Sequence, residues 1–199
     1  MINVNITTTD GTVAVTSPYN GNFVVSARNL GGRWNAAAKA WEFDSRDEGD
    51  VRSLCLEIYG TDGSPVETCT LKISFPEGAY AQTDSLAVAG RVIARAWGRD
   101  SGAKLGDGVR LIEGKFSSGG SRKNWDTNAA RGTIVLVRDF PRPMAERIVS
   151  EGFGDIEENL RHCHAEIIEE GNGSVDRAAL EAERERLLAR LAEIEKALA

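Results

Sequence analysis

The sequence predicts an α+β fold with a small ββαβα N-terminal domain, a middle antiparallel β-sheet or small barrel, and C-terminal helices that end in a coiled-coil helix. Three patterns predict these parts. Apolar and polar residues alternate on both sides of Asp10-Gly11, a dipeptide typical of two-residue hairpin turns. Glycine-rich turns separate several apolar runs between residues 66 and 137. Residues 175–199 are mainly Ala, Glu, Arg and Leu at near-heptad spacing.

The first domain is expected to span residues 1–63. After the hairpin, Phe23, Ala27 and Leu30 fall at helical spacing, and Gly31-Gly32 ends the helix because glycine tolerates the left-handed conformation of a C-cap. A strand follows in which apolar residues alternate with Glu42. A second helix then places its apolar residues on one face, namely Val51, Leu54, Cys55 and Ile58.

Four aromatic residues dominate this domain: Phe23, Trp34, Trp41 and Phe43. A tight loop between the two tryptophans would return the second beside the first. We expect all four to form the core, because large aromatic residues dominate small cores. The alternative is an exposed aromatic platform that stacks on nucleic-acid bases, flanked by the cations Arg28, Arg33 and Lys39.

The order of these residues resembles a known type of unit. Phe23, Ala27-Arg28-x-Leu30-Gly31-Gly32-x-Trp34-Asn35 and Lys39-x-Trp41-x-Phe43 are similar to a short Trp-containing unit of phage and plasmid proteins and, distantly, to the HARP domain of annealing helicases. The resemblance covers roughly residues 11–60 and implies a role in recognising DNA. The chain has no Walker A pattern, so the resemblance extends to binding and not to a helicase motor.

The middle domain is expected to span residues 64–143, with residues 86–97 as one long strand that has a possible bulge at Gly90. The connections 98–108 and 117–131 have turn composition, and loops of this kind often carry binding groups. The second connection could offer backbone N–H groups, two cations and an indole to a polyanion; the alternative is a solvated hairpin tip. The candidate contact residues are Arg99, Lys104, Arg122, Lys123, Trp125 and Arg131.

The C-terminal part is expected to comprise a helical connector over residues 144–172 and an oligomerisation helix over residues 173–199. In the connector, Ile156, Leu160, Cys163 and Ile167 are spaced by 4, 3 and 4 residues, which predicts a helix. The second helix has a narrow apolar seam and needs a partner, which favours a homodimer over packing on its own domain. The seam consists of Leu180, Leu187, Leu191, Ile194 and Leu198.

Arg161-His162-Cys163-His164 is a cluster with metal-ligand chemistry. Successive helical residues point about 100° apart, so the three ligand types cannot converge on one ion. Cys69 is the remote thiol that could complete a site. We therefore expect no metal, no cofactor and no catalytic residue.

Composition and charge indicate where the protein works. The chain lacks a run of about 18 apolar residues and a signal-peptide pattern, and its three cysteines are far apart, so we expect a cytoplasmic protein that does not span a membrane. The net charge is −6, yet residues 91–142 carry 11 basic and 5 acidic residues. If a part of the chain meets nucleic acid, this basic segment is the strongest candidate.

These observations favour a non-enzymatic accessory protein, from a mobile element or its host, that binds nucleic acid or a nucleoprotein as a dimer. The first alternative is a protein-binding inhibitor or adaptor, such as an anti-CRISPR-like phage counter-defence protein, that uses the acidic C-terminal third. The second alternative is an enzyme whose site has no recognisable motif.

Overall fold

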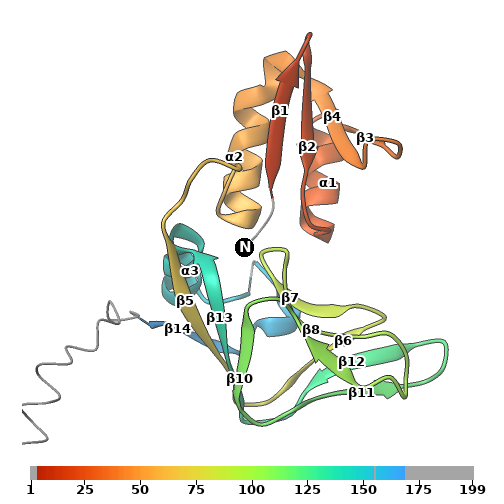
Figure 1. Cartoon of the computed structure of the whole chain (residues 1–199), viewed down its shortest axis with the longest axis vertical. Helices are drawn as coiled ribbons and strands as arrows, with labels where there is room; N and C mark the ends of the chain where they lie inside the picture. Colours follow the sequence, from red (N-terminus) through yellow and green to blue (C-terminus); the bar gives the residue numbers. More distant parts are fainter. Residues whose placement is uncertain (1–3, 155, 169–199) are drawn as a thin grey trace, which may run out of the picture. The chain divides into compact units, whose positions relative to one another are not determined.

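Strands β1 (Asn5–Thr9) and β2 (Thr12–Thr16) form the N-terminal hairpin in a computed structural model, which describes residues 4–154 and 156–168 (Figure 1). Asp10 and Gly11 have φ values of 41° and 82°. Two successive left-handed residues are the geometry of a type I′ turn, which matches the twist of the flanking strands. The predicted Asp-Gly hairpin is therefore present.

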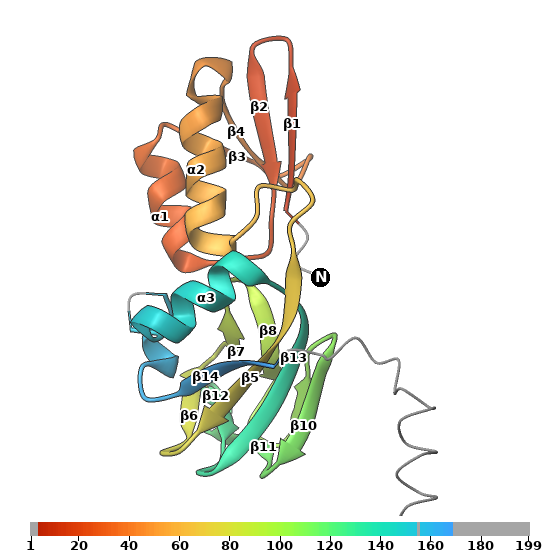
Figure 2. The ribbon, with the colours of Figure 1, turned by 90° about the vertical axis from the view of Figure 1, so that its left-hand side faces the viewer.

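A four-stranded antiparallel sheet and two helices complete the N-terminal part. Helix α1 (Gly21–Asn29) is capped by Asn20, whose side chain accepts a hydrogen bond from Phe23 N at 3.0 Å. The hairpin of β3 (Arg33–Asn35) and β4 (Ala40–Asp44) gives the strand order β1-β2-β4-β3. After the short 3₁₀ helix η1 (Ser45–Asp47), α2 (Glu48–Tyr59) packs beside α1, and both helices lie along the sheet (Figures 1 and 2).

The second four-stranded sheet contains the longest strands of the described chain. Strand β5 (Thr68–Phe75) pairs with β13 (Thr133–Pro141) on one side and with β14 (His164–Ile168) on the other, and β10 (Val109–Glu113) adds to β13. All of these pairs are antiparallel. Helix α3 (Arg142–Glu151) leaves β13 directly and covers the sheet near β14 (Figure 2).

Two three-stranded sheets complete the described fold. One has the order β11-β12-β6, from β11 (Phe116–Gly120), β12 (Trp125–Ala129) and β6 (Ala79–Gln82). The other has the order β7-β8-β9, from β7 (Ser85–Val88), β8 (Arg91–Ala96) and β9 (Ala103–Leu105). The buried Thr127 hydroxyl joins them, because it donates to Asp84 O at 2.6 Å and accepts from Ala96 N at 3.0 Å.

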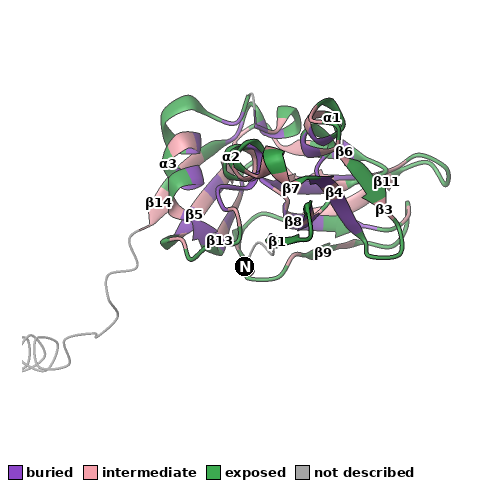
Figure 3. Ribbon diagram, turned by 90° about the horizontal axis from the view of Figure 1, so that it is seen from above, coloured by how far each residue is buried: buried purple, intermediate pink, exposed green. Residues whose placement is uncertain are grey.

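One continuous apolar core runs through the described chain. It includes residues of α1 and α2, the inward faces of β5, β8 and β13, and α3. Figure 3 shows buried positions on β4, β5 and β8, with exposed positions on the outer sides of α1 and α3. Residues 4–168, apart from residue 155, thus belong to one compact unit. The domain boundaries expected at residues 63 and 143 remain predictions.

The predicted α+β class is wrong for the described chain. Antiparallel strands in four sheets dominate it, and its three α-helices are short. The expected helix over residues 156–167 is instead the 3₁₀ turn η2 (Glu158–Leu160) followed by β14. Leu160 and Cys163 are buried as the helical spacing required, but the free edge of β5 provides strand pairing for the residues that follow. The predicted coiled-coil helix, residues 173–199, lies outside the described residues.

The long strand predicted over residues 86–97 is also wrong, because it folds back on itself as β7 and β8. Ala89 and Gly90 have φ values of 48° and 74°, so they form a two-residue turn of the same left-handed kind as Asp10-Gly11. The expectation of one strand failed because alanine rarely adopts this conformation. No helix within the described residues is long and apolar enough to cross a membrane.

Tyr59, at the end of α2, connects the N-terminal sheet and helices to the remaining sheets. The side chain is fully buried, and its hydroxyl donates to Pro18 O at 2.8 Å and lies 3.2 Å from Ser17 Oγ. A Cβ atom added at Gly90 would lie 2.8 Å from the Tyr59 ring. The β7–β8 turn therefore packs against Tyr59 only because residue 90 is glycine.

Gly90→Ala should destabilise the protein more than a Gly→Ala substitution at a site where the added methyl group strains the backbone but touches no other atom. Gly132→Ala is the matched control, because Gly132 has a φ of 78° and no atom within 4 Å of the added Cβ. We expect Gly90→Ala to cost about 1–3 kcal/mol of unfolding free energy beyond the cost of Gly132→Ala, owing to the clash with Tyr59. Urea unfolding measures both values. Equal losses would show that the Tyr59 contact does not constrain this turn.

Candidate functional site

Three of the four aromatic residues in the N-terminal part are core residues, as expected. Phe23, Trp41 and Phe43 are buried. The expectation is wrong for Trp34, which is 54% exposed and rests against Trp41 with a ring-centroid distance of 5.8 Å. Its strand β3 lies at the edge of the sheet, so one face of the indole has no neighbouring strand to cover it. The flanking cations are exposed, namely Arg28, Arg33 and Lys39.

The cations predicted on the connections lie at several separate places. Arg122 and Lys123 are exposed in the β11–β12 turn, and Trp125, the first residue of β12, is half-buried. Arg131 lies in the β12–β13 turn and donates from Nε to Pro76 O at 3.1 Å. Arg99 forms an ion pair with Asp100 at 2.8 Å, which offsets its charge.

Lys104 is the predicted residue that the fold places beside an exposed indole. Trp97 follows β8 and is 55% exposed. The Lys104 Nζ lies 5.8 Å from the Trp97 ring centroid, and the Arg95 guanidinium carbon lies 5.9 Å from it. The strand register pairs Arg95 with Lys104. We call these three residues the Trp97 platform.

Sequence reasoning missed Arg95 and Trp97, although a signal for them exists. They flank the buried Ala96 at the end of β8, and the guanidinium of Arg95 lies over the Trp97 ring, so both side chains are on the same outward face. Within the described residues neither Arg95 nor Lys104 has an ion-pair partner. Their charges are therefore available to a ligand, apart from the attraction to the indole.

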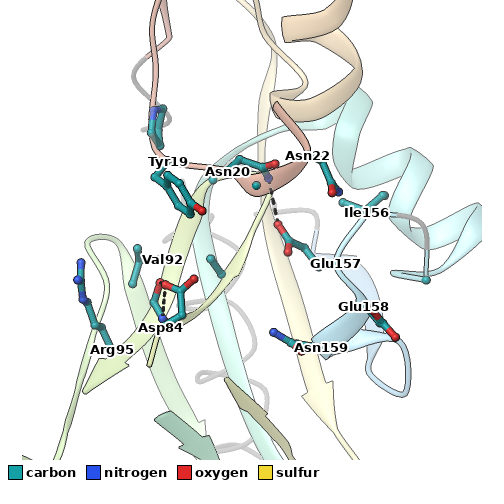
Figure 4. A pocket seen from close by; sticks show the side chains of 16 residues that line it. Tyr19, Asn20, Asn22, Asp84, Val92, Arg95, Ile156, Glu157, Glu158 and Asn159 are labelled. Carbon is teal, nitrogen blue, oxygen red and sulfur yellow. Dashed lines mark hydrogen bonds between the residues drawn. The ribbon is translucent and has the colours of Figure 1, made fainter. Parts of the chain in front are cut away.

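A cleft of about 750 Å³ adjoins the platform. Its floor is the outward face of the β7–β8 hairpin, including Val92 and the platform residue Arg95. Its walls come from the start of α1 and from the segment around η2, so three parts of the chain that are distant in sequence meet here (Figure 4). We call it the Asp84–Glu157 cleft, after its two carboxyl groups: Asp84 directly precedes β7 at the floor, and Glu157 lies in the wall before η2.

The two carboxyl groups have different surroundings. Asp84 is exposed, and its Oδ1 accepts from Ser85 N at 2.7 Å and lies 3.3 Å from the Ser85 hydroxyl. Glu157 is partly buried, and its Oε1 accepts from Asn20 Nδ2 at 3.3 Å. Burial raises the pKa of Glu157 to about 7, and the nearby Asp84 charge adds to the rise, while a backbone hydrogen bond from Ala89 opposes it.

The histidine and cysteine cluster does not form a metal site in the described chain. No group of three or more possible ligands is close enough there to hold an ion. Cys163 is buried, while His164 on β14 pairs with Ser74 and thus lies at the opposite end of that strand from the Cys69 side of β5. Burial raises the pKa of the Cys163 thiol to about 12, so it remains protonated.

Glu157→Gln should make stability less sensitive to pH. The pKa of Glu157 rises from an ordinary 4.5 to about 7 on folding. Its stabilising contribution to the free energy of unfolding is therefore complete below pH 4.5 and is lost as the pH rises through 7. We expect the unfolding free energy of the variant relative to wild type to increase by about 1–3 kcal/mol between about pH 5 and about pH 8. Urea unfolding at both pH values measures the difference.

Glu158→Gln is the matched control, because the neighbouring Glu158 side chain is 84% exposed. Its stability should follow wild type across the same pH range. A constant difference between Glu157→Gln and wild type at all pH values would contradict the assigned environment of Glu157.

Comparison with known proteins gives no further guide to the site. No family model matches the chain, and neither a curated protein nor a solved structure shows a significant match. The chemistry of the platform and the cleft is therefore the basis for a functional proposal. The resemblance of residues 11–60 to the HARP domain remains a prediction.

Proposed function

We propose that the protein binds single-stranded nucleic acid through the Trp97 platform. The observation that carries the proposal is a half-exposed indole flanked by two cations, with centroid distances of 5.8 and 5.9 Å. An exposed indole offers a π face to any base, and stacking of this kind contributes about 1–3 kcal/mol per base. Arg95 and Lys104 are in place to attract the adjoining phosphates.

The surrounding charge supports the same proposal. The segment 91–142, which includes β8 to β13, has a local charge excess of +6 although the whole chain is acidic. Exposed cations of this segment include Lys104 on β9 and Arg122 and Lys123 in the β11–β12 turn, and strands β9 and β11 are in contact. A basic surface on an acidic protein favours a polyanion at one place and repels it elsewhere.

A single strand fits this surface better than a duplex. The platform is built on a sheet edge, with Lys104 on the edge strand β9, and aromatic side chains on sheets bind unstacked bases in several single-strand binding folds. Duplex readers usually insert a helix into the major groove. The three α-helices of the described residues bring few basic residues to one face: α1 contains Arg28, α2 contains Arg52, and α3 contains Arg142 and Arg147.

A protein partner is the second candidate, and a specific feature favours it. A groove of about 380 Å³ lies beside α1, lined by Val25, Ile58, Ile156 and polar residues. Val25 is 59% exposed and offers apolar surface to a partner at this groove. This surface suits the adaptor or inhibitor predicted as an alternative. Homodimer formation through residues 173–199 and a cytoplasmic location remain predictions that the proposed binding does not require.

Trp97→Ala should weaken binding of a labelled single strand by about 5- to 150-fold, because it removes the stacking face. Trp34→Ala is the matched control, since Trp34 is exposed to a similar extent, 54% against 55%, in another sheet. Its affinity should stay near that of wild type. Fluorescence anisotropy with an oligonucleotide of about 16 nucleotides measures all three proteins.

Salt dependence provides a second readout in the same experiment. Affinity should fall between about 50 mM and about 200 mM salt, and Lys104→Ala should reduce the slope of log affinity against log salt by about 0.7. Absence of binding at about 50 mM salt, or equal affinities of wild type and Trp97→Ala, would overturn the proposal. A stable complex with a host protein in place of nucleic acid would favour the second candidate.

A further inference from the structure

We propose that the Asp84–Glu157 cleft receives one unstacked base of the bound strand and that guanine is the base that fits its polar groups. This inference rests on the proposed single-strand binding and adds a second, base-selective contact to it. The cleft has the size of a small-molecule site, since such sites enclose about 300–1,000 Å³ and its volume is about 750 Å³. Its polar groups and its position beside the platform carry the proposal.

The position of Arg95 connects the cleft with the platform. The side chain lines the cleft and its guanidinium also lies over Trp97. Val92, on the same outward face of β8, forms part of the cleft floor and offers an apolar surface for the plane of a base. A strand stacked on Trp97 therefore has the next binding surface directly beside it.

Asp84, directly before β7, offers a hydrogen-bond acceptor at the floor of the cleft. Its Oδ1 is engaged by Ser85, whereas its Oδ2 has no hydrogen bond from the described residues. Guanine presents two adjacent donors, N1–H and N2–H₂, on its Watson–Crick edge, and a carboxylate can accept both. Thymine and uracil present one donor between two carbonyl oxygens, which a carboxylate repels.

The two walls of the cleft offer groups that can donate. Asn20 is only 8% exposed and positions Glu157 through its side-chain amide, and Asn22 and Asn159 contribute further amides (Figure 4). With a pKa of about 7, Glu157 is partly protonated near neutral pH and can donate to a carbonyl oxygen such as guanine O6. Guanine places that oxygen next to its two donors.

Tyr19 completes the cleft as an aromatic lid. Tyr19 is 76% exposed. In the view of Figure 4 its ring lies above Asp84, and Glu157 lies to the right of both. A base between Tyr19 and the floor would cover this exposed ring by stacking. Charge also fixes the orientation: the Asp84 carboxylate repels phosphate, so the uncharged base enters while the phosphates remain near Arg95 and Lys104.

The first experiment compares oligothymidines of about 16 nucleotides that carry one central dG, dA, dC or dT. Wild type should bind the dG oligonucleotide about tenfold more tightly than the all-dT oligonucleotide. Asp84→Asn should remove this preference, so that the dG and all-dT oligonucleotides bind the variant with equal affinity. The matched control, Glu158→Gln, changes a carboxylate at the cleft rim whose side chain is 84% exposed and should keep the preference.

The second experiment needs no oligonucleotide binding and no variant. Guanosine, which carries no phosphate, is titrated into the full-length wild-type protein, and the amide chemical shifts of Asn20, Ser85, Gly90 and Asn159 are followed by NMR. Guanosine should shift these cleft amides, and thymidine should not. Free arginine and spermidine serve as cationic competitors, because two carboxyl groups could also attract a cation.

The outcomes separate the two proposals. Guanosine shifts without any oligonucleotide binding would reject the platform proposal and would identify the cleft as a site for a free guanine base only. Oligonucleotide binding without a base preference, together with no guanosine shifts, would reject the cleft inference and keep the platform. Shifts caused by arginine or spermidine but not by guanosine would identify a cation site and overturn the inference.

Discussion

The buried contact of Tyr59 with Gly90 and Pro18 is the constraint on which the rest of the described structure depends. Tyr59 ends α2, Pro18 leads into α1, and Gly90 lies in the β7–β8 turn, so one side chain joins three segments. Burial raises the pKa of the phenol, so the hydroxyl stays protonated and remains a donor to Pro18 O. The start of α1 is thereby held beside the β7–β8 hairpin, and these two elements form the first wall and the floor of the cleft.

A second set of polar contacts holds the remaining wall and the platform. Glu157 accepts from Asn20, which also caps α1, so the segment before η2 is bound to the helix start. The buried Thr127 hydroxyl fixes the end of β8 by accepting from Ala96 N. Because Ala96 lies between Arg95 and Trp97, this hydrogen bond also sets the direction in which the platform residues point. A buried hydroxyl with both partners satisfied resists displacement, since an unpaired group would cost about 1–3 kcal/mol.

The arrangement of charge explains how an acidic chain could bind a polyanion. The platform cations have no acidic partner within the described residues, whereas other arginines do: Arg46 pairs with Asp44, Arg52 with Glu48, and Arg99 with Asp100. Carboxyl groups occupy the adjoining cleft. A bound nucleic-acid strand would thus have cations beside its phosphates and hydrogen-bond acceptors beside a base edge. This arrangement would orient the strand as well as attract it.

Features that depend on neighbouring residues could be predicted from the sequence. Asp10-Gly11 specifies the hairpin turn, Asn20 and Gly31-Gly32 bound α1, and the alternation at Trp41-Glu42-Phe43 specifies β4, because turn, cap and strand preferences are local. The basic character of residues 91–142 could likewise be predicted from the sequence, and Lys104 was one of the candidate contact residues in that segment. The strand at residues 164–168 depends on a long-range contact, because the free edge of β5 supplies pairing that local helical spacing could not reveal.

Tertiary structure alone also decided the site. The exposure of Trp34 and Trp97 against the burial of Trp41 depends on which strands lie at sheet edges and which faces are covered, and sequence spacing does not contain that information. Asp84 and Glu157 are more than 70 residues apart, and they share a cleft because Tyr59 holds the start of α1 beside the β7–β8 hairpin and Asn20 binds Glu157. Local preferences therefore predicted much of the N-terminal hairpins and helices, whereas long-range packing created the platform and the cleft.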